Sequence, residues 1–246
     1  MKLSWKKEKI SDMVKIRVFI PHLELKEIFE DVVKKLPQYE FQFVPTSDDD
    51  LLIGVESGKY DIGTKGAWKT PAREKKYIFP KNNIAASVIG VTIRKEDANT
   101  IKNLDDFAKA GKKLVPIAPQ NAQYQVIEDY NTAHPDHPIK LEASENFQVA
   151  DAYTWVLEGR YDGYFAIELA YKKNVEAPDA PYKDFKDKLS YFRYKAIPTY
   201  TVINKNDKEL AEQVDKALGE LKQEGKIAEL EKKYFGEEVS QLIDVK

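Results

Sequence analysis

Cysteine is absent from this sequence of 246 residues, and neither sign of charge is in excess. Without cysteine the protein can form neither a disulfide nor a thiolate nucleophile. The 39 basic and 41 acidic residues leave a formal net charge of −2, so the chain lacks the basic footprint typical of nucleic-acid binding. We therefore expect no nucleic-acid partner.

Long hydrophobic runs are also missing. The longest apolar run lies near Ile84–Ile93 and is too short to span a bilayer. The opening residues, MKLSWKKEKI, are charged and lack the apolar core of a signal peptide. We expect either a cytoplasmic protein or a mature chain from which an export segment has been removed.

The common sequence signatures of enzymes and metal sites are missing as well. The sequence contains no G-x-S-x-G, P-loop, G-x-G-x-x-G, H-E-x-x-H or C-x-x-C pattern, which weakens the common enzyme classes without excluding catalysis. His134 and His137 are interleaved with Pro135 and Pro138, which predict a turn, and no third or fourth ligand is near them in the sequence. We predict no metal site and no cofactor.

Both halves of the chain show an alternation of strand and helix patterns. An apolar fraction of 42% and a charged fraction of 33% are typical of a globular protein. Apolar residues recur at helical spacing from Leu25 to Leu36, and Pro37 ends that helix. The first half also contains three predicted strands and a second predicted helix, at 15–20, 39–44 and 61–64 and between 48 and 58.

The second half follows the same order. Its predicted strands lie at 87–94, 113–118, 140–142, 161–167 and 191–204, and its predicted helices at 103–110, 121–132 and 146–157. A long amphipathic helix with Asp207 as its N-cap runs to Gly225, and a last helix covers 227–234. This rhythm predicts an α/β fold of two lobes, each a mostly parallel sheet flanked by helices.

The segment from Gly58 to Pro80 combines a turn, a short apolar strand, a loop of small residues and an arginine placed to meet an anion, Arg73. Ligands in open α/β sheets bind beyond the carboxyl ends of the strands. In the predicted order these ends fall at 21–22, 65–68, 119–121 and 167–168.

Four stretches of the chain resemble the type II periplasmic binding proteins, in the family 3 solute-binding class that serves ABC importers of amino acids. They are GKYDIGTKGAWKTPAREKKYIFP, GKKLVPIAPQNAQ, LEGRYDGYFAIELA and KALGELKQEGKIAELEKKYFGEE. Two further stretches, KLPQYEFQFVPTSDDDLLIGVESGKYD and PIAPQNAQYQVIEDYN, are most similar to the lipoproteins of Gram-positive bacteria that bind cystine and related sulfur amino acids.

This resemblance implies a two-lobed type II periplasmic-binding-protein fold whose lobes are joined by two hinge strands, near 88–94 and 195–202. Lobe one would comprise residues 1–92 and 196–246, and lobe two residues 93–195. The resemblance also implies an extracytoplasmic monomer, periplasmic or anchored as a lipoprotein. Such a protein closes on a small polar solute, here an amino acid such as cystine, and delivers it to an ABC permease without an enzymatic step.

In lobe one, the resemblance places Arg73 at the carboxylate-binding arginine of the family. A guanidinium can meet a carboxylate with two parallel hydrogen bonds, although an arginine at a helix start can also be a surface residue. Lys65, Gly66 and Trp68 occupy the neighbouring loop, where the family commonly has small residues or hydroxyls. Trp68 either stacks on the ligand or fills space.

In lobe two, the resemblance points to the start of a helix and to the end of a strand. Backbone N–H groups at a helix N-terminus suit a carboxylate, and the positions there are Gln120, Asn121, Ala122 and Gln123. The family usually has an aspartate for the ligand's ammonium after the strand at 161–167. Here Ile167 takes that position and Glu168 follows it, either as a substitute ammonium ligand or as a structural carboxylate.

The start of lobe one departs from the family, which inserts a loop with a ligand-packing aromatic after its first strand. Here the chain passes almost directly from Ile20 through Pro21 and His22 into a helix. Two alternatives to amino-acid capture follow from these departures. One is an enzyme on the same scaffold, such as a lyase or dehydratase of a small carboxylic acid with Glu168 as its acid or base. The other is an altered or engineered binding protein that has lost amino-acid binding.

Overall fold

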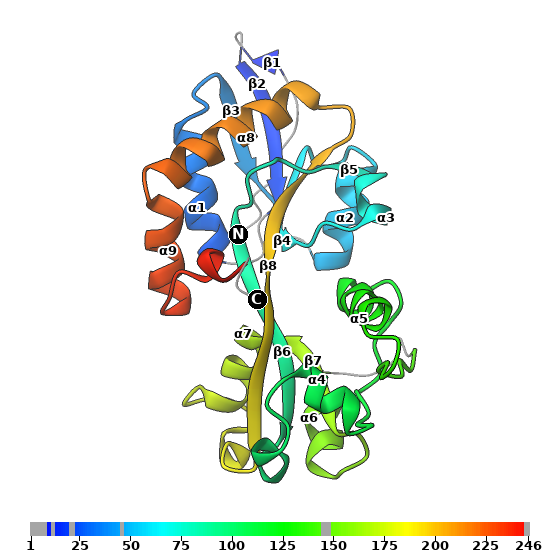
Figure 1. Cartoon of the computed structure of the whole chain (residues 1–246). Coiled ribbons are helices and arrows are strands. Elements are labelled where there is room, and N and C mark those ends of the chain that lie inside the picture. The colour runs from blue at the N-terminus through cyan, green and yellow to red at the C-terminus, as the bar shows by residue number, and fades with distance from the viewer. Residues whose placement is uncertain (1–8, 11–12, 20–22, 45–46, 144–148, 244–246) are drawn as a thin grey trace. The chain divides into compact units, whose positions relative to one another are not determined.

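The computed structural model describes residues 9–10, 13–19, 23–44, 47–143 and 149–243, and these residues form two compact units. The first unit extends to Ser87 and resumes at Ile197, and the second runs from Val88 to Ala196. Two strands, β6 (Ala85–Arg94) and β8 (Leu189–Asn204), carry the chain across the two divisions (Figure 1). No helix in the described part of the chain is long and apolar enough to cross a membrane.

The first unit contains a mixed sheet. Its strand β2 pairs in parallel with β3 and β4 and in antiparallel with β1, while β4 and β5 both pair in antiparallel with the second part of β8. The strands predicted at 39–44 and 61–64 are confirmed with shifted ends. The bounds of the shorter strands are β1 (Lys9–Ile10), β2 (Met13–Phe19), β3 (Tyr39–Phe43), β4 (Ile62–Ala67) and β5 (Tyr77–Ile78).

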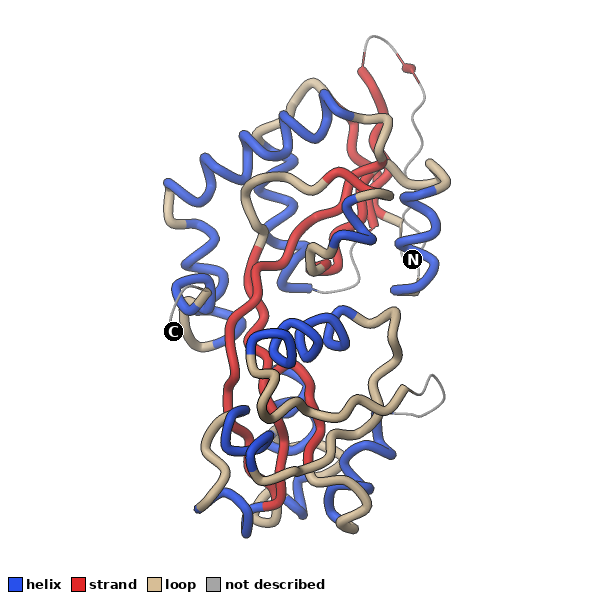
Figure 2. The backbone as a smooth tube through the Cα atoms, turned by 45° about the vertical axis from the view of Figure 1, so that its right-hand side comes forward, coloured by secondary structure: helices blue, strands red, loops and turns tan. Residues whose placement is uncertain are grey.

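Helices pack on this sheet through apolar faces that the sequence periodicity predicted. The α1 face is at most 5% exposed, and each large apolar side chain buried in this way contributes about 1.5–3 kcal/mol to stability. Helix α1 packs against α8 and α9 (Figure 2). The buried face of α1 and its extension consists of Leu25, Ile28, Phe29, Val32 and Leu36. The helices of the unit are α1 (Leu23–Lys34), α2 (Asp48–Glu56), α3 (Pro71–Glu74), α8 (Lys208–Gln223), α9 (Lys226–Phe235) and the 3-10 turn η4 (Val239–Leu242).

The second unit is built on β6 and β7 (Gly163–Ile167), which pair in antiparallel from Ile89↔Ile167 to Ile93↔Gly163. A core that includes Tyr153 and Val156, both 0% exposed, lies beside them. The helical elements of this unit are η1 (Lys95–Asn99), α4 (Leu104–Lys109), α5 (Ala122–Ala133), α6 (Val149–Leu157), α7 (Glu168–Tyr171), η2 (Lys172–Glu176) and η3 (Lys183–Phe185).

The strands predicted at 113–118 and 140–142 are wrong. In the first stretch only Leu114 forms a bridge, in parallel with Gly163, and Pro116 has no N–H with which to continue a ladder. Before the second stretch, the backbone N and O of Ile139 are both bonded to the Asn131 side chain, at 2.7 and 2.8 Å. The pairing of β6 with β7, by contrast, is antiparallel.

Candidate functional site

The segment that holds Arg73 is an excursion between two strands that both pair with β8. Strand β4 leaves the sheet after Ala67, which is opposite Tyr200, and β5 rejoins it at Tyr77, which is opposite Asn204 (Figure 1). The rings of Phe79 and Tyr200 meet edge to face at 5.8 Å. The intervening nine residues are therefore fixed to one strand at both ends.

Asp61 fixes the start of β4. It is 4% exposed, and its carboxylate accepts a hydrogen bond from the Arg17 backbone N at 2.8 Å and lies 3.4 Å from Arg17 Nε. Its carbonyl accepts a hydrogen bond from the Asn204 N at 2.9 Å. Because Asp61 connects β2 to β4 and β4 to β8, it holds the strand from which the loop emerges.

Gly66 lets β4 change register before the loop. Its φ of +70° is in the left-handed region, which glycine adopts without the strain of a side chain, and the pairing with β8 shifts between Gly63 and Ala67. Trp68 is 7% exposed, and Lys65 is half-buried. Of the two roles that the sequence left open for Trp68, stacking on the ligand and filling space, this burial favours filling space.

Arg73 lies in α3, a short helix that is absent from the predicted order of elements, although a helix start at Arg73 is one of its two interpretations from the sequence. Thr70 is its N-cap and accepts a hydrogen bond from the Arg73 N at 3.3 Å, and Pro71 follows at the first helical position. A threonine followed by a proline is a known signal of a helix start and could have revealed α3.

The guanidinium of Arg73 is half-buried and held by one carbonyl. Its Nη1 donates to the Trp68 O at 2.9 Å, and within the described ranges no carboxylate forms an ion pair with it. Burial lowers the pKa of Arg73, against the smaller opposing effect of Tyr77, but an arginine stays protonated in proteins. A partly desolvated cation with unused N–H donors can bind a carboxylate.

The predicted residues of the second unit lie at the start of α5. Gln120 and Asn121 are exposed, while Ala122 and Gln123 are half-buried. Asn121 is the N-cap residue, but its side chain makes no capping hydrogen bond. The first turn of α5 therefore presents backbone N–H groups that the cap leaves unused, and such groups suit an anion.

Glu168, the other predicted residue of this unit, is engaged by two cations. Its carboxylate accepts two hydrogen bonds from Arg193, both at 2.9 Å, and Lys172 Nζ lies 3.5 Å away. Ile167 precedes it in β7 and is half-buried opposite Ile89. A ligand ammonium would have to compete with Arg193 and Lys172 for this carboxylate. The Arg193 contact could not be found from local sequence spacing.

The two histidines of the predicted turn have other partners than a metal. His137 Nε2 lies 2.5 Å from Asp105 Oδ1, and His134 Nδ1 lies 2.9 Å from the Tyr130 carbonyl. The Tyr130 and His134 rings stack at 4.2 Å. Over the described residues, no group of three or more His, Cys, Asp or Glu side chains could hold a metal ion.

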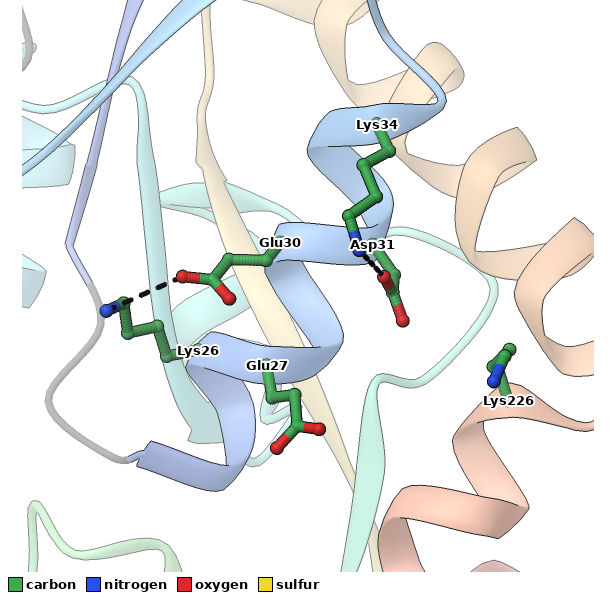
Figure 3. Close-up of a pocket in the computed structure, with 6 residues that line it drawn as sticks. All are labelled: Lys26, Glu27, Glu30, Asp31, Lys34 and Lys226. Atoms are coloured by element: carbon green, nitrogen blue, oxygen red, sulfur yellow. Dashed lines mark hydrogen bonds and ion pairs between the residues drawn. The ribbon is translucent and has the colours of Figure 1, made fainter.

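A groove on the surface of α1 and α9 contains only charged side chains. Figure 3 shows Lys26 paired with Glu30 and Lys34 with Asp31. Glu27 is bonded to Lys233 and Tyr234 of α9, and Lys226 to Glu229. These charges compensate one another, and none of the predicted binding residues lines this groove.

The structure thus places Lys65, Gly66, Trp68 and Arg73 along one segment of the first unit, with the first two at the end of β4, Trp68 just after it and Arg73 in α3. It places Gln120–Gln123 and Glu168 at two positions of the second unit. The predicted shortened loop at 20–22, with His22, lies outside the described residues.

Most of the chain is similar to known bacterial solute-binding proteins. Residues 26–237 match the family described as bacterial extracellular solute-binding proteins, family 3. The L-cystine-binding protein TcyJ of Bacillus subtilis is 28% identical over 221 residues, which cover 87% of this chain and 76% of that protein.

Solved structures of this kind share the fold. The probable amino-acid ABC transporter extracellular-binding protein ytmK of Bacillus subtilis superposes with a TM-score of 0.69 at 23% identity, over 87% of each chain. A structure from a study of glutathione import by GshT and the cystine importer TcyBC of Streptococcus mutans gives a TM-score of 0.67, also at 23% identity. That match covers 90% of this chain and 87% of the other.

Proposed function

Because the chain belongs to family 3 of the bacterial extracellular solute-binding proteins, we propose that it captures an amino acid, cystine or a close relative of it. It would hand this solute to an ABC permease at the outer face of the cell membrane. The names of similar proteins support the proposal, since the relatives TcyJ, TcyK and TcyA of Bacillus subtilis are each named as L-cystine-binding proteins.

The single observation that supports a ligand with a carboxylate is the environment of the Arg73 guanidinium. It is half-buried, donates to the Trp68 carbonyl at 2.9 Å, and has no carboxylate partner among the described residues. A ligand carboxylate would provide the counter-charge and accept the remaining N–H donors in a bidentate pair. The exposed start of α5 in the second unit is a further candidate for carboxylate or backbone recognition.

We propose that capture is coupled to closure of the two units. The chain crosses between them only within β6 and β8 along its described course, so these strands would act as the hinge. The closed form would be the one that the permease recognises. No catalytic step is part of the proposal, because the named relatives are binding proteins and the Glu168 carboxylate is held by two cations.

The test is isothermal titration with L-cystine and the common L-amino acids, on the unmodified chain and on Arg73→Gln. We expect Arg73→Gln to weaken binding by at least about tenfold, since one hydrogen bond to a charged group contributes about 1.5 kcal/mol or more. Lys75→Gln is the matched control, because Lys75 is an exposed cation two residues further along. Its affinity should equal that of the unmodified chain.

Two results would contradict the proposal. One is that no amino acid of the panel binds to the folded chain. The other is that Arg73→Gln binds as tightly as Lys75→Gln. Mass spectrometry of the bound fraction should recover the amino acid unchanged, whereas turnover to a new product would favour the enzyme alternative.

A further inference from the structure

Lys205, the first residue after β8, binds the helix that carries Arg73. Its Nζ donates to the carbonyl oxygens of Glu74 at 2.9 Å and of Lys75 at 2.8 Å. These carbonyls belong to the last residue and the C-cap of α3, where a helix leaves its acceptors unpaired. A lysine ammonium is a suitable partner for them, because it supplies several donors and a positive charge.

The two ends of α3 are therefore fixed in different ways. At its start, the Thr70 side chain accepts from the Arg73 N, and the Trp68 carbonyl holds the guanidinium. At its end, the carbonyl oxygens of Glu74 and Lys75 accept hydrogen bonds from Lys205, and no other side chain in the described part of the chain binds them. A helix of four residues has almost no stability of its own, so its orientation depends on these contacts.

Resting on the proposed function, we infer that Lys205 is a positioning residue for the carboxylate-binding Arg73. It does not contact the ligand in this proposal. It fixes the turn of helix from which the guanidinium projects, and it does so from the end of β8, the strand that also pairs with β4 before the loop and with β5 after it. The orientation of Arg73 is thereby tied to β8.

The experiment measures L-cystine affinity by titration for Lys205→Met, Lys205→Arg and Lys208→Met. We expect Lys205→Met to weaken binding about fivefold, which corresponds to about 1 kcal/mol and is typical of a lost exposed hydrogen-bonded contact. Lys205→Arg should restore affinity to within about twofold, because a guanidinium can also donate to two carbonyls. Lys208→Met is the control: Lys208 is exposed, lies three residues further on, and has no side-chain partner in the described chain.

A double-mutant cycle separates positioning from a general structural effect. If Lys205 acts through Arg73, Lys205→Met should cause no further loss of affinity in the Arg73→Gln background. A loss of equal size in both backgrounds would overturn the inference. The inference would also be overturned if Lys205→Met bound L-cystine as tightly as the unmodified chain while Arg73→Gln bound it weakly. That result would leave the proposed function intact.

A second measurement does not need the ligand. The backbone amides of Glu74 and Lys76 donate to the Thr70 and Arg73 carbonyls at 2.9 and 3.0 Å, so their hydrogen exchange reports the order of α3. In Lys205→Met these amides should exchange faster, and in Lys208→Met at the rate of the unmodified chain. Equal rates in both variants would overturn the inference whatever the ligand. If Arg73→Gln does not weaken binding, the proposed function itself fails.

Discussion

Glu231 is a carboxylate inside the core of the first unit. Its side chain in α9 is 0% exposed, and it accepts hydrogen bonds from the Ser240 N at 2.9 Å and the Ser240 Oγ at 2.6 Å. Burial raises the pKa of Glu231, against the opposing effect of the bonds from Ser240 and the backbone of Ala86. Through these bonds the carboxyl group of Glu231 connects α9 both to η4 and to the start of β6 inside the core.

The raised pKa of Glu231 predicts a direction for stability against pH. A group whose pKa is higher in the folded chain than in the unfolded chain stabilises the fold while it is protonated. For Glu231 this contribution is complete below the unfolded-chain pKa of about 4.3, and it is lost as the pH rises from there through the higher pKa of the folded chain. The unmodified chain should therefore lose stability relative to Glu231→Gln over that rise. Denaturant unfolding at a series of pH values would measure the difference.

The control for this prediction is Glu212→Gln, because Glu212 is exposed on α8. The stability difference between Glu212→Gln and the unmodified chain should stay nearly constant over the same pH range. A Glu231→Gln difference that is equally constant would contradict the idea that burial disfavours the charged form of Glu231.

At the scale of the elements, the loop that holds Arg73 depends on the backbone at Gly66. A φ of +70° costs a residue with a side chain about 1 kcal/mol, and an added Cβ would lie 3.4 Å from Thr199 Cβ. Gly66→Ala should therefore lower the free energy of unfolding by about 1 kcal/mol and also weaken ligand binding, because the bulge before Trp68 would move.

Gly225→Ala separates these two effects. Gly225 has a similar φ of +75°, and an added Cβ would meet no atom within 4 Å. Gly225→Ala should therefore lower the free energy of unfolding, measured by chemical denaturation, by a similar amount and leave ligand affinity unchanged. Equal ligand affinities for Gly66→Ala and Gly225→Ala would contradict the role of Gly66 in shaping the loop.

Local sequence patterns predicted most helices and strands. They failed where a contact with a residue distant in sequence determined the local structure. Helix α1 was predictable because an apolar stripe and Pro37 mark its face and its end. The stretch at 113–118 is apolar enough for a strand, but Pro116 interrupts the ladder and Ile117 finds its acceptor at Glu142. Helix α3 is too short for any periodicity, and only the Thr70–Pro71 pair announces it.

At the scale of the whole molecule, the proposed ligand should stabilise the folded chain by mass action. A ligand at 100 times its dissociation constant adds about 2.7 kcal/mol if it binds only the folded state. Scanning calorimetry with L-cystine should therefore show a higher midpoint for the unmodified chain and a much smaller shift for Arg73→Gln at the same concentration.

The calorimetric trace also tests the contribution of the second unit. If the start of α5 also contributes to binding, the whole unfolding transition should move upward. If only part of the trace moves, with the second unit unfolding at its original temperature, the start of α5 does not contribute to binding.

The sequence by itself determined the family and the α/β order, because apolar periodicity, helix-ending Pro and Gly residues and the motif around Arg73 are all local patterns. Only the tertiary structure decided the partners of the charged residues: Arg17 for Asp61, Arg193 for Glu168, and Lys205 for the end of α3. The physical reason is that side chains far apart in sequence meet only when strands are paired. Which carboxylates are satisfied, and which guanidinium is left with an unused face, cannot be known before that pairing exists.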